Sequence, residues 1–184
     1  MVAPVRRREL LSTSGAAGAS LLVAGCGGGS VQKLSQLPGS VRAADADLLN
    51  GVLDVEHLVV TAYTAAVPLL SHHNERAAQH FLDQESSHLN DLAKLIRSAG
   101  GSPHGERPRY DLGNPRSETE LLELLRRVEG QAVSTYLETI PRLVSGEARQ
   151  TAISILAVEA QHLSIIRRNL GLRPVPSALV AGAQ

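Results

Sequence analysis

Apolar residues recur every three to four positions in four stretches of this 184-residue chain. This spacing places them on one face of an α-helix. No stretch alternates between apolar and polar residues with the period of two that is typical of strands. The predicted helices run from after Ser40 towards Pro68, from after Asn74 to Gly100, from Ser117 to about Pro141 or Ser145, and from about Glu147 to Leu170. The pattern therefore predicts an all-α fold.

Residues between the predicted helices indicate how the helices are connected. Ser117-x-x-Glu120 is a capping box at the start of the third helix, and Gly171 is a C-terminal stop for the fourth. Residues 100–117 are rich in Gly, Pro and charge, which predicts one long connection. The other two connections are short. This order predicts a four-helix bundle of two helical hairpins joined by one long crossover.

The two predicted hairpins also resemble each other in sequence. Four residues of the first helix recur in the third at a shift of 73 positions, and three residues of the second recur in the fourth at a shift of 74. The matching pairs are Glu56 and Glu129, Val60 and Val133, Tyr63 and Tyr136, Pro68 and Pro141, Glu85 and Glu159, His88 and His162, and Leu89 and Leu163. A repeat of this length predicts two equivalent hairpins related by a pseudo-two-fold axis.

Six polar residues interrupt the apolar stripes of the four helices and are therefore predicted to point into the core. They are Glu56, Glu85, His88, Glu129, Glu159 and His162. A glutamate is almost never fully buried unless it is paired, and four converging carboxylates would repel one another. No Lys or Arg occupies the stripes at this level. Two divalent cations would balance the four negative charges.

The spacing of these residues suits metal binding. In Glu-x-x-His, the carboxylate and the imidazole lie about one turn apart on one helical face, so both can reach the same ion. Glu85-x-x-His88 and Glu159-x-x-His162 both have this spacing, and Glu56 and Glu129 can complete or bridge the two coordination spheres. Oxygen and nitrogen ligands without sulfur favour iron or manganese and tolerate zinc.

The pattern of six residues resembles the di-metal carboxylate proteins of the ferritin-like superfamily, which includes ferritins, rubrerythrins and manganese catalases. The resemblance covers about residues 45–171 and implies a ferritin-like four-helix bundle with two iron ions, or two manganese ions. In that family each Glu-x-x-His pair binds one metal, the Glu of the second pair often bridges, and the lone glutamates are terminal or bridging ligands.

The resemblance implies an oxidoreductase of the oxidase, ferroxidase or peroxide-consuming type. The chain has one Cys and therefore no Cys-x-x-Cys electron-relay module, so turnover would need an external electron donor or a self-contained catalase cycle. The alternative is a non-catalytic envelope protein that binds iron, or a stress-related structural module. A homodimer is compatible with either function.

The N-terminal residues resemble export signals. Arg7-Arg8-Glu9-Leu10-Leu11 is similar to a twin-arginine signal, and Val23-Ala24-Gly25-Cys26 is similar to a bacterial lipobox, in which Cys26 would be lipidated. We expect a signal peptide over 1–25, a flexible tether over 26–40, the bundle over 41–171 and a tail over 172–184. The protein would then be exported and held by its lipid on the outer face of the bacterial cytoplasmic membrane. An uncleaved apolar N-terminus or a plain secretory signal is the alternative.

Other polar and aromatic residues are weaker candidates. Tyr63 and Tyr136 each follow a stripe glutamate by seven positions, about 10.5 Å along the axis, so we expect them to fill the core, with a hydrogen bond to a ligand as the alternative. Asp54-x-x-His57 lies on a flank of its helix, away from the apolar stripe. Zero net charge and only one Phe and three Tyr argue against nucleic acid as a partner.

Overall fold

The computed structural model describes residues 31–179 and 181–182. Its long helices are α1 (Gly39–Ala66), α2 (His72–Ser98), α3 (Glu118–Thr139) and α4 (Gly146–Asn169), and its 3-10 helices are η1 (Leu34–Gln36), η2 (Val67–Leu69) and η3 (Ile140–Arg142). No strand occurs among the described residues, and the predicted all-α fold is confirmed. The predicted export signal, with Arg7, Arg8 and Cys26, lies outside the described residues.

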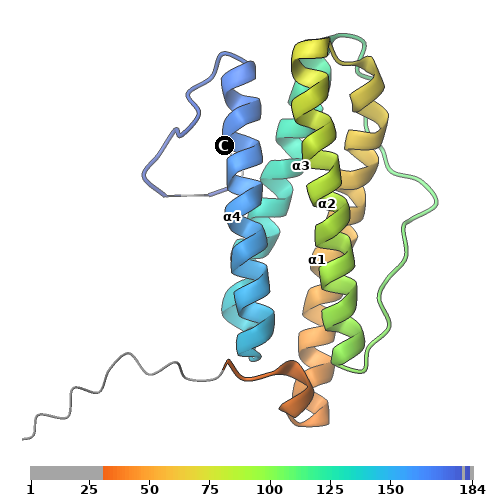
Figure 1. The fold of residues 1–184 in the computed structure, drawn as a ribbon, viewed down its shortest axis with the longest axis vertical. Coiled ribbons are helices and arrows are strands. Elements are labelled where there is room, and N and C mark those ends of the chain that lie inside the picture. The colour runs from red at the N-terminus through yellow and green to blue at the C-terminus, as the bar shows by residue number, and fades with distance from the viewer. Residues whose placement is uncertain (1–30, 180, 183–184) are drawn as a thin grey trace, which may run out of the picture. The chain divides into compact units, whose positions relative to one another are not determined.

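The four helices form a bundle of two antiparallel hairpins, α1 with α2 and α3 with α4 (Figure 1). Residues 99–117 form the long connection between them, which runs along the side of the bundle from the end of α2 to the start of α3. Helix α1 packs extensively against α2 and α3, and α3 packs against α4, whereas α2 and α4 make far fewer contacts with each other. The predicted arrangement of two hairpins and one crossover is therefore confirmed.

Local sequence explains where most of the helices begin and end. The Ser117 hydroxyl accepts a hydrogen bond from the Glu120 amide at the start of α3, and Ser145 accepts one from the Ala148 amide at the start of α4. Gly171 follows α4 with a φ of +74°, a conformation in which glycine carries no Cβ penalty.

The predicted start of α2 after Asn74 was wrong. Ser71 precedes the helix, which begins at His72. The Asn74 side chain instead donates to Glu118 Oε1 at 2.8 Å and accepts from Asn169 Nδ2 at 2.8 Å. Asn74 therefore joins the ends of three helices, a tertiary role that its cap-like residue type does not reveal.

Two apolar clusters fill the bundle, one on each side of the polar residues predicted for the metal site. One cluster contains Leu49, Leu92 and Tyr136, and the other contains Val59, Tyr63 and Phe81. Leu34 of η1 is fully buried in the first cluster, so described residues of the segment expected as a tether pack on the bundle. The apolar surface that is buried on both sides stabilises the bundle around the layer in which the polar residues meet.

Helix α1 is the most apolar of the long helices in composition. Together with η2, over Gly39–Leu69, it is long and apolar enough to cross a membrane by composition alone, with a mean hydropathy of 1.3 over its best window. Its apolar face contributes to both core clusters, which accounts for that composition.

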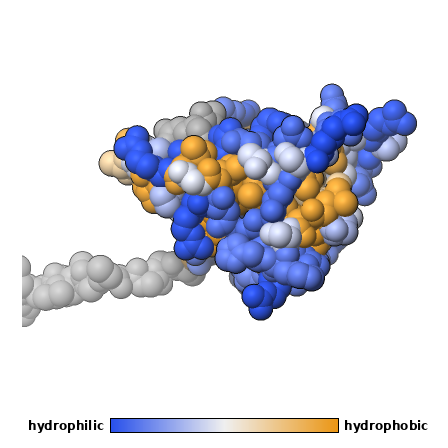
Figure 2. Space-filling view, turned by 90° about the horizontal axis from the view of Figure 1, so that it is seen from above, coloured by the Kyte–Doolittle hydropathy of each residue, from blue (hydrophilic) through white to orange (hydrophobic). Residues whose placement is uncertain are grey.

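On the end of the bundle in Figure 2, hydrophobic surface is interrupted by hydrophilic side chains.

Candidate metal centre

The six polar residues predicted for a metal site meet inside the bundle. Helix α1 provides Glu56, α2 provides Glu85 and His88, α3 provides Glu129, and α4 provides Glu159 and His162. All four glutamates are fully buried, and His88 and His162 are 8% and 2% exposed. The structure therefore brings together all six residues that interrupt the apolar stripes.

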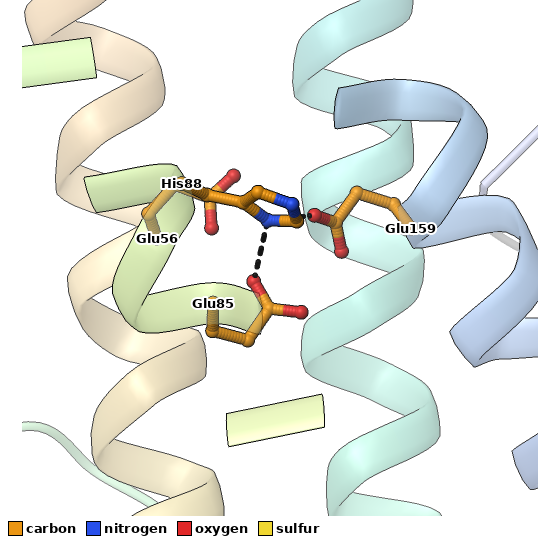
Figure 3. Close-up of side chains that lie close together, drawn as sticks. All are labelled: Glu56, Glu85, His88 and Glu159. Atoms are coloured by element: carbon orange, nitrogen blue, oxygen red, sulfur yellow. Dashed lines mark hydrogen bonds and ion pairs between the residues drawn. The ribbon is translucent and has the colours of Figure 1, made fainter. Parts of the chain in front are cut away.

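The six side chains form two overlapping groups of four. One group is Glu56, Glu85, His88 and Glu159, shown in Figure 3, and the other is Glu85, Glu129, Glu159 and His162. Within each group, one oxygen or nitrogen from every residue lies within 4.8 Å of the others. Glu85 and Glu159 belong to both groups, so these two carboxylates are placed to bridge two ions.

Both imidazoles direct Nδ1 towards the shared carboxylates. His88 Nδ1 lies 2.8 Å from Glu159 Oε1 and 3.2 Å from Glu85 Oε2. His162 Nδ1 lies 2.8 Å from Glu85 Oε1 and 3.8 Å from Glu159 Oε2. Each histidine is thus closest to the shared glutamate of the opposite hairpin, which gives the site its approximate two-fold symmetry.

Two buried tyrosines hold the glutamates that belong to one group only. Tyr63 of α1 donates to Glu129 Oε1 on α3, and Tyr136 of α3 donates to Glu56 Oε1 on α1, both at 2.5 Å. Each tyrosine is too far along its helix to reach the glutamate seven residues before it, but it reaches the glutamate of the antiparallel helix. Both tyrosines fill the core and bond a ligand candidate, so the two alternatives of the sequence analysis apply together.

Two residues that the sequence pattern does not mark as part of the site contact His162. Gln84 Oε1 lies 2.9 Å from His162 Nε2, and the Phe81 ring stacks on the imidazole with 4.1 Å between centroids. Phe81 belongs to the apolar core of the bundle, and nothing in the sequence around Gln84 marks it as part of a site. Their positions next to a histidine of another helix depend on how α2 and α4 face each other, which periodicity alone does not give.

Burial controls the protonation of the two glutamates that bond the tyrosines. In the absence of metal, burial and then the neighbouring Glu159 carboxylate raise the pKa of Glu56 well above its usual value. Burial and Glu159 likewise raise the pKa of Glu129. Without metal, both carboxyl groups therefore retain their protons to a higher pH than an exposed glutamate does.

The imidazoles carry positive charge without metal. Burial lowers the pKa of His88, but its contacts with Glu159 and Glu85 outweigh burial and raise the pKa to about 9. His162 is affected in the same way, chiefly by Glu129 and Glu159, and its pKa rises to about 12. Burial raises the pKa of Glu159, but its contacts with both histidines outweigh this effect and lower the pKa to about 2.

The donor atoms fit a pair of divalent ions. Each tyrosine occupies one oxygen of its glutamate, and the second oxygens, Glu56 Oε2 and Glu129 Oε2, are buried without a hydrogen bond among the described residues. A buried acceptor without a partner is costly unless another ligand satisfies it. Carboxylate oxygens and imidazole nitrogens are donors that iron, manganese and zinc accept in proteins.

Asp54-x-x-His57, which has the same spacing as the two Glu-x-x-His pairs, has a structural role. Asp54 Oδ1 lies 3.1 Å from His104 Nδ1 of the crossover, and His57 Nε2 lies 3.2 Å from the His104 carbonyl oxygen. Asn50 also accepts a hydrogen bond from the His104 amide. These contacts fasten the crossover to the outer face of α1, away from the six core residues.

Comparison with known proteins agrees with this architecture. A sequence profile described as the ferritin-like domain matches residues 44–172. A solved structure of a conserved hypothetical protein from Mycobacterium tuberculosis is similar, with 19% identity and a TM-score of 0.66 over 70% of this chain and 98% of that one. A ferritin-like, diiron-carboxylate protein from Bacillus anthracis str. Ames is similar at 20% identity and a TM-score of 0.64, over 71% of this chain and 97% of that one. No curated protein matches the sequence.

Proposed function

This chain belongs to the ferritin-like domain family, and we propose that it binds two iron or manganese ions and acts as an oxidoreductase. The observation that carries this proposal is the pair of four-residue groups that share Glu85 and Glu159. Two ions held by shared carboxylates would be able to act together on one small substrate. The Bacillus anthracis structure, described as a diiron-carboxylate protein, supports iron as the first metal to test.

Each residue of the centre has a distinct role in this proposal. Glu85 and Glu159 would bridge the ions. Glu56 and His88 would complete one coordination sphere, and a second pair, Glu129 with His162, would complete the other. With all four carboxylates ionised and both imidazoles neutral, two divalent ions would leave the buried centre without net charge, which is the condition for burying so many acids.

The tyrosines and the apolar clusters prepare the ligands. Tyr136 occupies Glu56 Oε1 and Tyr63 occupies Glu129 Oε1, so each carboxylate presents its remaining oxygen to the centre. Such hydrogen bonds orient a ligand before the ion arrives and typically change metal affinity by about 10–100-fold. The apolar layers on either side limit the access of water.

Bound iron or manganese would supply redox chemistry, and a pair of ions can exchange the two electrons that reduce one peroxide to two waters. Ferrous iron as a substrate would provide these electrons as it becomes ferric. Hydrogen peroxide alone would serve as both donor and acceptor in a catalase cycle. Reduction of dioxygen, or of peroxide outside a catalase cycle, would need another external electron donor if ferrous iron is not the substrate. With one Cys, the chain has no Cys-x-x-Cys relay module to pass those electrons.

The activity test compares wild-type protein with Glu85→Ala, which removes one bridging carboxylate. Metal-loaded wild type should consume ferrous iron in air, or hydrogen peroxide, faster than Glu85→Ala at equal protein concentration. Exposed Asp83→Ala, on the same helix, is the matched control and should behave as wild type. If wild type binds metal but exceeds Glu85→Ala in neither assay, the oxidoreductase proposal fails and the protein is a non-catalytic metal binder.

Export is a separate proposal that depends on the N-terminal sequence alone. The twin-arginine-like Arg7-Arg8 and the lipobox-like residues ending at Cys26 support export of the folded protein and its lipid attachment to the outer face of the cytoplasmic membrane. In a bacterium that has both twin-arginine export and lipoprotein processing, Cys26→Ser should move the protein from the membrane to the soluble exported fraction. Arg7→Lys combined with Arg8→Lys should retain the protein in the cytoplasm. Unchanged fractionation of both variants would contradict this proposal.

A further inference from the structure

The two halves of the centre have matching ligands but different surroundings. At the shift of 74 positions that relates the two Glu-x-x-His pairs, Gln84 corresponds to Val158 and Phe81 corresponds to Ile155. Gln84 Oε1 lies 2.9 Å from His162 Nε2. A valine side chain at the matching position offers His88 no such hydrogen bond.

Solvent access differs in the same direction. The His162 side chain is 2% exposed and the His88 side chain is 10% exposed. The described residues provide His162 Nε2 with a hydrogen-bond partner, whereas no hydrogen bond is found for His88 Nε2 among them. His162 also stacks on Phe81 at 4.1 Å, and Ile155, the residue matching Phe81, has no ring to stack on His88.

These differences act on the metal through the ligand. When Nε2–H of His162 donates to Gln84, the lone pair of Nδ1 stays directed at the centre, and the stacked ring has little freedom left to lose on binding an ion. His88 must adopt the same tautomer and orientation without either contact, and it does so at the wetter side of the centre. The contacts of Gln84 and Phe81 therefore favour metal at His162 over metal at His88.

We propose that the two metal positions are inequivalent: the ion held by Glu129 and His162 binds more tightly than the ion held by Glu56 and His88, with Gln84 as the positioning residue. This inference rests on the proposed metal-binding function. An outward hydrogen bond of this kind typically changes affinity by about 10–100-fold. We expect a difference of that size between the two positions, with the exchangeable ion on the His88 side.

The test uses Co²⁺ as the probe and separates the positions with single-ligand variants. His88→Ala retains the His162 position, and His162→Ala retains the His88 position. The dissociation constant of Co²⁺ should be at least about tenfold lower for His88→Ala than for His162→Ala. Adding Gln84→Val should weaken binding about tenfold or more in the His88→Ala background and leave binding unchanged in the His162→Ala background.

The reciprocal variant and a control complete the design. Val158→Gln, which copies Gln84 into the other hairpin, should strengthen Co²⁺ binding in the His162→Ala background. Gln79→Val, an exposed glutamine on α2 that bonds Asp83, should change neither background. The same variants, measured by release of Co²⁺ to a chelator, should show faster release from the His88 position.

The outcomes separate this inference from the function on which it rests. Equal affinities for the two single-ligand variants, or an equal loss in both on adding Gln84→Val, would overturn the inequivalence while leaving the metal centre intact. Wild type that binds no Co²⁺ at all would overturn the proposed function and the inference together. Circular dichroism identifies any variant that fails to fold. If Gln84→Val is one of them, Gln84→Glu takes its place. Because Gln84→Glu retains an acceptor oxygen, it should keep the tight binding of Co²⁺ at the His162 position.

Discussion

Filling the metal centre should release protons. At pH 7 the metal-free protein holds protons on His88 and His162, whose pKa values are about 9 and about 12. A metal ion binds the neutral imidazole, so both protons must leave when both positions fill. Burial raises the pKa values of Glu56 and Glu129 well above the usual value, and any proton that they still hold must leave as well.

The structure sets the size of the effect. Each displaced proton makes the overall binding constant rise tenfold per pH unit, or about 1.4 kcal/mol. At least two protons per centre therefore predict an overall constant for two ions that rises by about 100-fold per unit between about pH 7 and pH 8. The slope should decrease as the pH rises past about 9, because His88 then loses its proton even without metal.

Titration calorimetry with Mn²⁺ measures the protons directly. The apparent enthalpy in several buffers, plotted against the ionisation enthalpy of the buffer, has the number of released protons as its slope. His162→Ala should release fewer protons than wild type, whereas His80→Ala, an exposed residue on α2, should release the same number. Release of less than one proton per centre, or an affinity that does not change between pH 6.5 and 8.5, would refute this account of the site.

Three further predictions follow from the same geometry. Tyr136→Phe should weaken metal binding by about 10–100-fold at one position only, because Glu56 loses the bond that orients it, and a calorimetric titration that resolves two affinity classes checks this. Glu85→Gln should weaken metal binding at both positions, since that carboxylate belongs to both groups. If Glu85→Gln, like Tyr136→Phe, weakened binding at one position only, Glu85 would not bridge the two ions. His88, with its folded pKa raised to about 9, contributes stability to the metal-free protein below about pH 6.5 that is lost as the pH rises through 9. The melting temperature of the protein, measured with a chelator present to remove metal, should therefore fall as the pH rises from about 6.5 to about 9. His88→Ala should show a smaller fall over the same pH range.

Much of the fold follows from local pattern. The apolar spacing predicts four helices, and the Gly- and Pro-rich stretch of 100–117 predicts the crossover, because both signals act within a few residues of sequence. The start of α2 was misplaced because Ser71 and Asn74 are both favourable cap residues. The Asn74 and Glu75 amides both donate to the Ser71 carbonyl, which places Asn74 inside the first turn. Its side chain then contacts Glu118 and Asn169 of other helices.

The buried cluster of glutamates and histidines was predictable because its residues break a rule. Glutamates such as Glu56 and Glu129 in the middle of apolar stripes require a compensating charge, and the repeat in the sequence indicates that the two hairpins contribute equally. The asymmetry was not predictable in this way. Gln84 has no unusual position on its own helix, and its role arises only because α4 places His162 beside it.

The tyrosines show the same limit. Spacing along one helix correctly separates Tyr63 from Glu56, but it does not say that the antiparallel α3 brings Glu129 to the tyrosine hydroxyl. The relative height of two helices depends on packing between side chains far apart in sequence. Ligand types and helix faces can therefore be deduced from sequence, whereas the hydrogen bonds that orient the ligands need the assembled bundle.

The central claim is that this bundle holds two metal ions, and elemental mass spectrometry of the purified protein tests it most directly. The account predicts about two iron or manganese ions per chain, one for each four-residue group, and a loss of both in Glu85→Ala combined with Glu159→Ala. A chain that contains no transition metal, even after anaerobic reconstitution with iron and manganese, would contradict it.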